Sequence, residues 1–204
     1  MANEMRTYVT VHSDSEKVAT RLQEIFKYDD SGKQYEATAL DVINNLEGTN
    51  FTYSNETTKE DWSKEVDFPS NELWDSIIGP KWMYVEYDHG DLPEYCNVVL
   101  RSAWSVPTSF LERLRDELQK IDENCYITGT YEDESYDPSG AFVYGKFEYD
   151  DIEDYDEEYD EDESYEDDFY NEKWQESLVE LEKDLEKAYI EYLKDREENP
   201  QDYE

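Results

Sequence analysis

The chain has 204 residues, of which 56 are acidic and 18 are basic, and its formal net charge is −38. Proteins that bind duplex nucleic acid or anionic membranes use clustered Lys and Arg side chains to displace counterions from phosphates, so this composition excludes a general affinity for either. Hydrophobic residues make up only 37% of the chain, but 19 Tyr, 5 Trp and 7 Phe predict one folded domain with an acidic appendix.

The first half of the chain predicts a strand followed by two helices. Residues 5–11 alternate and are rich in β-branched side chains, which is typical of a strand. Apolar residues then recur at helical spacing at Val18, Leu22, Ile25 and Phe26. A weaker helical pattern covers residues 34–46 and ends at Gly48, and the polar residues 50–72 are predicted to form a loop.

The second half predicts two pairs of strands with a helix between them. Residues 82–87 and 95–104 are strand candidates joined by a hairpin-type connection. A helix follows Pro107, with apolar positions at Phe110, Leu111, Leu114, Leu118 and Ile121. Residues 125–131 and 141–149 complete the series as strands.

Without the second helix and the loop, this order is β-α-β-β-α-β plus one strand. We therefore predict an α+β, ferredoxin-like (split βαβ) fold, with an antiparallel sheet that carries its helices on one face. The predicted organisation is a domain over residues 1–149, an acidic, Tyr-rich tract over 150–171, and a C-terminal helix and tail over 172–204.

Three short segments carry a resemblance to a known family. They are Leu-Trp-Asp-Ser-Ile-Ile-Gly-Pro-Lys-Trp at 73–82, Arg-Ser-Ala-Trp-Ser-Val-Pro at 101–107 and Gly-Ala-Phe-Val-Tyr-Gly at 140–145. In these segments residues 1–149 resemble the YubB-like ferredoxin-like family of phage and plasmid proteins, although Ile-Ile-Gly-Pro stands where that family has Trp-Gly-Thr. The resemblance implies a fold and an origin in a mobile element, and no chemical activity.

The two cysteines, Cys96 and Cys125, lie in apolar, strand-like runs. Buried thiols in a reducing compartment are expected here rather than a disulfide. The N-terminus lacks the basic start and apolar core of a secretory signal, and no apolar run approaches the ~20 residues that span a bilayer. These features predict a cytoplasmic protein, in the host cell if the gene belongs to a phage.

Catalytic and metal-binding motifs are absent from the sequence. No nucleotide-binding, zinc-binding or paired-cysteine motif surrounds His12, His89 or the cysteines, so we expect no cofactor and no enzymatic activity. The acidic residues at 150–168 include no Gly, which an EF-hand loop requires, so no defined metal site is predicted. The aromatic residues Trp74, Trp82 and Trp104 are predicted to pack the sheet rather than to stack nucleic-acid bases.

Residues 148–170 contain 15 acidic residues and no basic residue. Like charges repel by about 1 kcal/mol per pair at ~4 Å in water, so we expect this segment to be disordered or to become ordered on binding a cationic partner. The interspersed tyrosines offer that partner apolar surface. The predicted partner-binding residues are Asp150, Asp151, Glu153, Asp154, Tyr155, Asp156, Glu157, Glu158, Tyr159, Asp160, Glu161, Asp162, Glu163, Tyr165, Glu166, Asp167 and Asp168.

Residues 172–198 predict a helix with a heptad-like apolar seam, made by Trp174, Leu178, Leu181, Leu185, Ala188 and Tyr192. This seam can pack on the sheet or helices of the domain. Alternatively, residues 174–192 mediate a homodimer or dock to a partner helix.

The charge and the resemblance together predict a non-catalytic acidic protein, encoded by a phage, that mimics nucleic acid. Such a protein binds and inhibits a basic, nucleic-acid-binding host protein, such as a restriction or other defence enzyme, without touching nucleic acid or membrane itself. One alternative is a structural or regulatory module that binds through its sheet and keeps the acidic residues for solubility. An enzyme with carboxylate acid–base chemistry and a general adaptation to salt are further alternatives.

Overall fold

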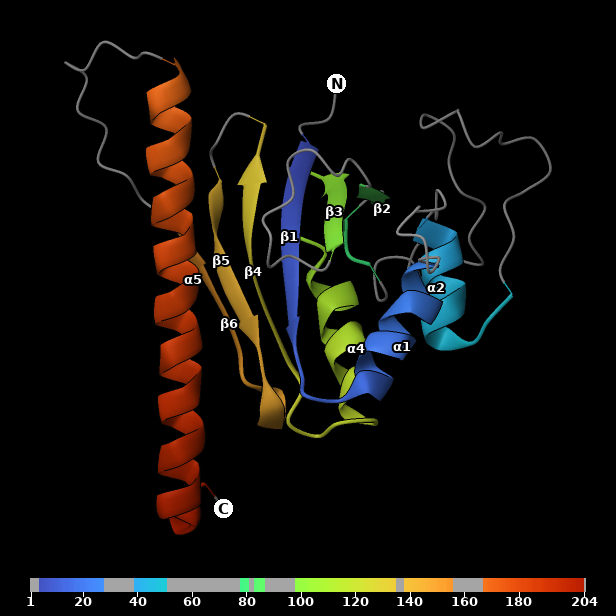
Figure 1. The fold of residues 1–204 in the computed structure, drawn as a ribbon, viewed down its shortest axis with the longest axis vertical. Helices are drawn as coiled ribbons and strands as arrows, with labels where there is room; N and C mark the ends of the chain where they lie inside the picture. Colours follow the sequence, from blue (N-terminus) through green and yellow to red (C-terminus); the bar gives the residue numbers. More distant parts are fainter. Residues whose placement is uncertain are drawn as a thin grey trace.

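The computed structural model describes residues 4–27, 39–50, 78–80, 83–86, 98–134, 138–155 and 167–203. Its centre is a six-stranded sheet, in the order β2-β3-β1-β4-β5-β6, in which every neighbouring pair is antiparallel (Figure 1). The strands are β1 (Glu4–His12), β2 (Met83–Glu86), β3 (Val98–Ala103), β4 (Tyr126–Asp133), β5 (Ser139–Tyr144) and β6 (Asp150–Asp154). The predicted α+β class and antiparallel sheet are confirmed.

Three helices lie on one face of this sheet: α1 (Glu16–Phe26), α2 (Ala39–Glu47) and α4 (Thr108–Gln119) (Figure 1). The apolar positions that predicted α1 are all buried, and those of α4 are buried except Ile121, which follows the helix. They form one core with the strands, centred on residues such as Met5, Val9, Leu100, Ile127 and Phe142. Gly48 follows α2 with φ +66°, the left-handed conformation expected of a glycine after a helix.

The long helix α5 (Asp167–Glu198) covers the other face of the sheet (Figure 1). Successive residues of β5 point to opposite faces, so Phe142 joins the first core while Ala141 and Val143 pack against Leu185 and Tyr189 of α5. The prediction of helices on one face is therefore correct for α1 and α4, but the sheet is covered on both sides. The apolar run at 141–144 is the sequence signal for a strand buried on both faces.

The buried stripe of α5 differs from the predicted seam. Its most buried residues are Trp174, Leu178, Glu182, Leu185 and Tyr189, which step by 4, 4, 3 and 4. Ala188, expected in the seam, is exposed. In a straight helix that packs on a sheet, positions on the same side recur every 3.6 residues. The predicted seam assumed instead the 3.5-residue repeat of a coiled coil, so the two sets of buried positions diverge along the helix. The apolar side of α5 therefore packs on the sheet of the same chain. The homodimer hypothesis required this side of the helix to be available to a second copy of the chain.

The predicted domain boundary at 149/150 falls inside the sheet. β6 pairs with β5 along its whole length, and α5 begins at Asp167, within the predicted acidic tract. The expectation of disorder is therefore wrong for residues 150–154 and 167–170. Residues 156–166 lie outside the described residues, as does most of the loop predicted at 50–72.

The strand predicted at 141–149 ends at Tyr144, where a short 3₁₀ turn, η1 (Lys146–Glu148), interrupts it. Gly145 begins the turn, and its N–H donates to the carbonyl of Tyr149 at 2.6 Å. A Cβ atom at position 145 would lie 2.2 Å from the Tyr189 ring, so only glycine allows α5 to approach the sheet so closely here.

Candidate functional site

Four of the predicted partner-binding carboxylates lie on β6, at the edge of the sheet. Residues 150–154 pair with residues 144–140 of β5. Side chains alternate along a strand, so Asp151 and Glu153 share one side, and residues on the same side are about 6.6 Å apart. That distance is close to the ~6–7 Å between successive phosphates that follows from a ~3.4 Å rise per base and the slant of the backbone.

The other two carboxylates of β6 serve the fold. Asp150 accepts a hydrogen bond from Arg115, a buried side chain of α4, and burial raises the pKa of Asp150 while the guanidinium opposes that rise. Asp154 accepts the hydroxyl hydrogen of Tyr131. These contacts tie β6 to α4 and to β4. Asp151 and Glu153 pair with Val143 and Ala141 of β5, so they lie on the side of the sheet that α5 covers, where Asp151 is half-buried and Glu153 is exposed.

Both ends of the segment 156–166 are fixed to the fold. At one end, the Tyr155 N–H donates to the carbonyl of Ser139 at 2.7 Å. The Tyr155 ring also meets Trp174 of α5 edge to face, with the ring centroids 4.9 Å apart. Because Trp174 is only 5% exposed, this pair ties the end of β6 to the first turns of α5. The acidic segment is thus a connection between two ordered elements and not a free tail.

Most of the predicted partner-binding residues belong to this connection. Those outside the described residues are Asp156, Glu157, Glu158, Tyr159, Asp160, Glu161, Asp162, Glu163, Tyr165 and Glu166. Asp167 and Asp168 lie in the first turn of α5.

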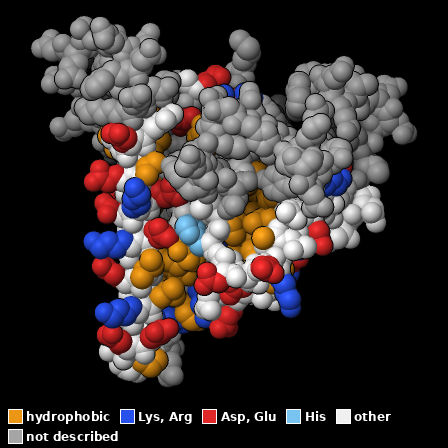
Figure 2. All heavy atoms as spheres, in the orientation of Figure 1, with side chains coloured by type: hydrophobic (Ala, Val, Ile, Leu, Met, Phe, Trp, Pro, Cys, Tyr) orange, Lys and Arg blue, Asp and Glu red, His pale blue; other side chains and the backbone are white. Residues whose placement is uncertain are grey.

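The outer face of α5 carries both signs of charge. Acidic and basic side chains alternate along it in Figure 2, and the exposed lysines Lys183, Lys187 and Lys194 lie among Glu180, Asp184 and Glu191. Such a face resembles an ordinary solvated helix more than a phosphate backbone. The densest acidic stretch without a basic residue is the one that runs from β6 through the acidic connection.

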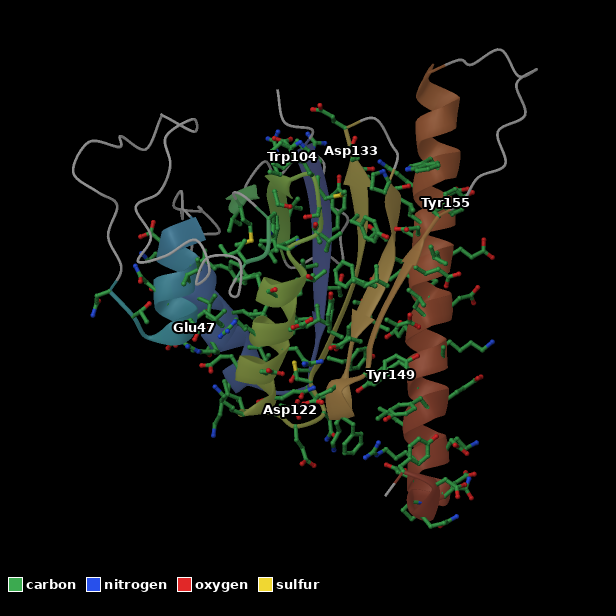
Figure 3. The ribbon with its side chains drawn as sticks, turned by 180° about the vertical axis from the view of Figure 1, so that it is seen from behind. Glu47, Trp104, Asp122, Asp133, Tyr149 and Tyr155 are labelled. Atoms are coloured by element: carbon green, nitrogen blue, oxygen red, sulfur yellow. The ribbon has the colours of Figure 1, made fainter. Side chains whose placement is uncertain are left out.

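Trp104 is an exposed aromatic side chain at the same end of the sheet as Tyr155 (Figure 3). It is 54% exposed and has φ +63°, a left-handed conformation that is rare for a bulky residue. The turn that holds it is closed by Ser102, whose hydroxyl donates to the carbonyl of Ser105 at 2.7 Å. The prediction that Trp104 packs in the core is wrong, because this turn faces it outward. Trp74 and Trp82 lie outside the described residues.

A polar cluster lies between the sheet and α5, and sequence reasoning missed it. The Thr128 hydroxyl donates to Glu182 at 2.6 Å and lies 2.9 Å from Nε2 of His12. Nδ1 of His12 is 3.7 Å from Glu186, which also accepts the Tyr126 hydroxyl hydrogen at 2.7 Å. Burial lowers the pKa of His12, partly offset by Glu186, and raises the pKa of Glu182.

This cluster has the residue types of a hydroxyl–imidazole–carboxylate catalytic triad, but its burial prevents that use. Thr128 is 1% exposed and lies beneath α5, so no substrate carbonyl can reach its hydroxyl while the helix is docked. The His12 ring stacks on Tyr126 with centroids 4.4 Å apart, which fixes its orientation. We interpret the cluster as the polar part of the contact between α5 and the sheet.

The remaining sequence predictions concern the two cysteine thiols, metal binding and membrane-spanning segments. Cys125 is a buried free thiol, and burial raises its pKa to about 12, whereas Cys96 lies outside the described residues. The described part of the chain contains no group of three His, Cys, Asp or Glu side chains that could hold a metal ion. Within that same part, every helix is too short or too polar to span a membrane.

Comparisons with known proteins give no relative for this chain. No protein-family model, no curated protein and no solved structure matches it. A function for the chain must therefore be argued from its own charge distribution and geometry.

Proposed function

We propose that this protein is a non-catalytic interaction protein that presents an anionic surface to a basic, nucleic-acid-binding protein and thereby competes with nucleic acid. The acidic connection between β6 and α5 is the observation that carries this proposal. It has eight carboxylates in the eleven residues 156–166, no basic residue, and structured attachment points at both ends.

The charge density of this connection is of the right order for mimicry. An extended chain spans at most about 3.3–3.6 Å per residue, so eight charges in eleven residues correspond to one charge per ~4.5–5 Å. One strand of B-form DNA carries one charge per ~3.4 Å. Asp151 and Glu153 of β6 continue the row of carboxylates on a rigid strand, and a cationic partner would be steered toward this end of the molecule.

Attachment at both ends favours binding for an entropic reason. A tethered segment loses less conformational freedom on binding than a free tail of the same composition, so more of its electrostatic attraction remains as affinity. The fixed ends also determine which edge of the fold the partner meets. Tyr155 and Trp174 are therefore positioning residues for the acidic connection.

Trp104 supplies an apolar contact beside the negative charge. Exposed Trp side chains are enriched among the residues that dominate binding energies, and this one is held in a rare backbone conformation. We infer that a partner engages the connection through its cations and Trp104 through an apolar pocket. This contact makes the interaction more specific than attraction between opposite charges alone.

We also propose that the domain has a ferredoxin-like core and that its gene comes from a phage or plasmid. The element order β1-α1-β2-β3-α4-β4 and the sheet order β2-β3-β1-β4 support a ferredoxin-like core, to which β5, β6 and α5 are added. The resemblance in residues 1–149 supports a phage or plasmid origin. A protein of that origin would act in the host cytoplasm, against a defence enzyme that binds nucleic acid.

The experiment begins with capture on the immobilised full chain from a bacterial lysate at low salt. A retained protein is purified and bound to a fluorescent 20-base-pair duplex, and displacement of the duplex by this chain is measured by anisotropy. Wild type should displace the duplex, and added salt should weaken the displacement. The proposal fails if no nucleic-acid-binding protein is retained, or if retained proteins keep their duplex.

Two charge-matched variants separate the acidic connection from total charge. The first changes Glu161, Asp162 and Glu163 to Gln, Asn and Gln, and the control makes the same changes at the equally acidic set Glu24, Asp14 and Glu16 near α1. The first variant should compete at least tenfold less well than the control. Equal losses would show that only overall charge matters, and no loss in either would favour the regulatory module that binds through its sheet.

A further inference from the structure

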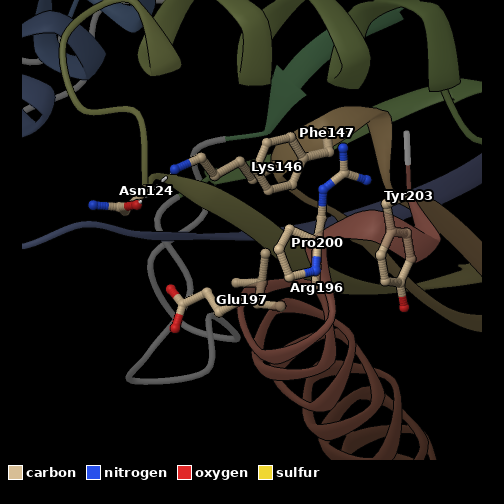
Figure 4. A pocket seen from close by; sticks show the side chains of 8 residues that line it. Asn124, Lys146, Phe147, Arg196, Glu197, Pro200 and Tyr203 are labelled. Atoms are coloured by element: carbon tan, nitrogen blue, oxygen red, sulfur yellow. Dashed lines mark hydrogen bonds between the residues drawn. The ribbon is translucent and has the colours of Figure 1, made fainter.

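A pocket of about 430 Å³ lies at the carboxyl end of α5 (Figure 4). The helix has 32 residues, about 48 Å of length, so this pocket is far from the acidic connection at the other end. Its wall combines the η1 turn, the last turns of α5 and the 3₁₀ turn η2 (Pro200–Asp202). The lining residues are Asn124, Lys146, Phe147, Leu193, Arg196, Glu197, Pro200 and Tyr203. Pockets of this size accept small organic ligands.

Arg196 is the unusual side chain in this pocket. In a chain with 56 acidic residues, carboxylates accept hydrogen bonds from Arg21, Arg101, Arg113 and Arg115. Among the described residues, however, no carboxylate lies within 4.0 Å of the Arg196 guanidinium. It donates one hydrogen bond to the Tyr192 hydroxyl, at 2.8 Å, which leaves most of its N–H groups available to a ligand.

Two aromatic rings fix the plane of this guanidinium. Its central carbon lies 3.9 Å from the Phe147 ring centroid and 5.1 Å from that of Tyr203 (Figure 4). The Tyr203 ring is held in turn because its hydroxyl donates to Asp195 at 2.6 Å. A guanidinium held flat presents a pair of parallel N–H groups, the geometry that recognises the two oxygens of a carboxylate or phosphate.

A second cation and a strained turn complete the pocket. The Lys146 ammonium lies 5.3 Å from the Phe147 ring centroid and donates to Asn124 at 3.2 Å. Its nearest carboxylate, Glu123 at 3.5 Å, is 78% exposed, so this ion pair is weak. Phe147 and Glu148 both adopt left-handed φ angles, +64° and +56°, at a cost of about 1–2 kcal/mol each. This strain keeps Phe147 48% exposed at the pocket instead of buried.

We propose that this pocket binds a small organic oxyanion. The phosphate or carboxylate group would receive hydrogen bonds from Arg196 and charge from Lys146, and the apolar body of the ligand would rest on Phe147 and Leu193. Among the charged side chains that line the pocket, two cations, Lys146 and Arg196, face one carboxylate, Glu197, whereas the net charge of −38 repels anions from the general surface. This inference uses no part of the acidic connection and is independent of the proposed competition with nucleic acid.

The test is calorimetric titration of the full chain with four probes: inorganic phosphate, phenyl phosphate, benzoate and phenol. At least one aromatic anion should bind with a dissociation constant below about 1 mM, and phenol should bind at least tenfold more weakly. Phenyl phosphate and benzoate distinguish a phosphate ligand from a carboxylate ligand. The amide resonances of Lys146 and Phe147 should shift on binding. The absence of binding by all three anions, or equal binding of phenol, would refute the proposal.

Matched variants on the same helix locate the binding. Arg196→Gln should weaken binding of the anion at least tenfold, and Arg196→Lys should restore it only in part, because the ammonium keeps the charge but lacks the planar pair of donors. Lys194→Gln removes the same charge from an exposed position that pairs with Glu198, and should change binding less than twofold. Lys146→Gln, outside α5, provides a second test if Arg196→Gln unfolds the helix end. Unchanged binding in both Lys146→Gln and Arg196→Gln would contradict the site.

Discussion

Substitution of Gly145 by Ala tests whether α5 is an integral part of the fold. The backbone at Gly145 is extended, with φ −117° and ψ −169°, so alanine fits the local conformation without strain. The added Cβ atom would instead meet Cε2 of Tyr189 at 2.2 Å, where an ordinary contact is at least 3.4 Å. One partner must therefore move by more than 1 Å, and Tyr189 is fully buried.

The expected cost of Gly145→Ala is about 1–3 kcal/mol, typical of an overpacked core, reduced by up to ~1 kcal/mol because alanine restricts the unfolded chain. For a chain of about 200 residues, each kcal/mol lowers the Tm by roughly 2–4 °C. Thermal unfolding followed by circular dichroism measures this loss. An unchanged or raised Tm would show that α5 does not pack on the sheet as described.

A double-mutant cycle identifies the contact responsible. Tyr189→Leu alone should destabilise the protein, since it removes a buried ring and the hydroxyl that accepts the Lys146 N–H at 2.8 Å. In that background most of the clash is gone, so the further cost of Gly145→Ala should fall by at least half. Additive losses in the double variant would assign the cost of Gly145→Ala to some other contact.

Three further predictions concern ionisable groups. Glu182→Gln should raise the Tm at pH 8, because burial raises the pKa of this carboxyl and its stabilising, protonated form is lost as the pH rises. The difference in Tm between the variant and wild type should shrink as the pH falls toward 4.5. A variant less stable than wild type at pH 8 would contradict this. His12 has a pKa below its usual 6.5, so its contribution to stability is lost as the pH falls through that lower value, and His12→Asn should lose less Tm than wild type between pH 7 and pH 5. Arg115→Met should cost about 1–3 kcal/mol in urea unfolding, because it removes a buried charged donor from Asp150, whose 29% exposed side chain can be hydrated in its place, and adding Asp150→Asn should recover part of that loss.

The sequence predicted correctly those elements in which apolar residues follow a regular spacing without interruption. The positions Val18, Leu22, Ile25 and Phe26 repeat at the helical spacing and are all buried in α1. The strand predicted at 141–149 is present as β5 over Ser139–Tyr144, which includes the continuous apolar run. Such local patterns can be interpreted without knowing which element packs against them, because the spacing of the apolar residues alone indicates the buried side of a helix or strand.

The parts that it missed depend on contacts between elements distant in the chain. β6 reads Asp-Asp-Ile-Glu-Asp, which has no strand-like alternation, and its pairing with β5 is supported by the buried Arg115 of α4. Glu182 is only 8% exposed because Thr128 of β4 donates to it, a partner 54 residues away. Trp104 was expected to pack the sheet because no basic residues accompany it as a base-stacking site would require, but a local turn determines its direction.

Because α5 follows all six strands in sequence, the order of the elements has a consequence for biosynthesis. The second face of β5 has no cover until α5 has left the ribosome, so the nascent chain exposes Ala141 and Val143 until then. A prematurely terminated product that lacks α5 would keep this apolar strip exposed and would be prone to aggregate. The acidic connection is translated just before the helix, and its mutual charge repulsion would help to keep neighbouring nascent chains apart during that interval.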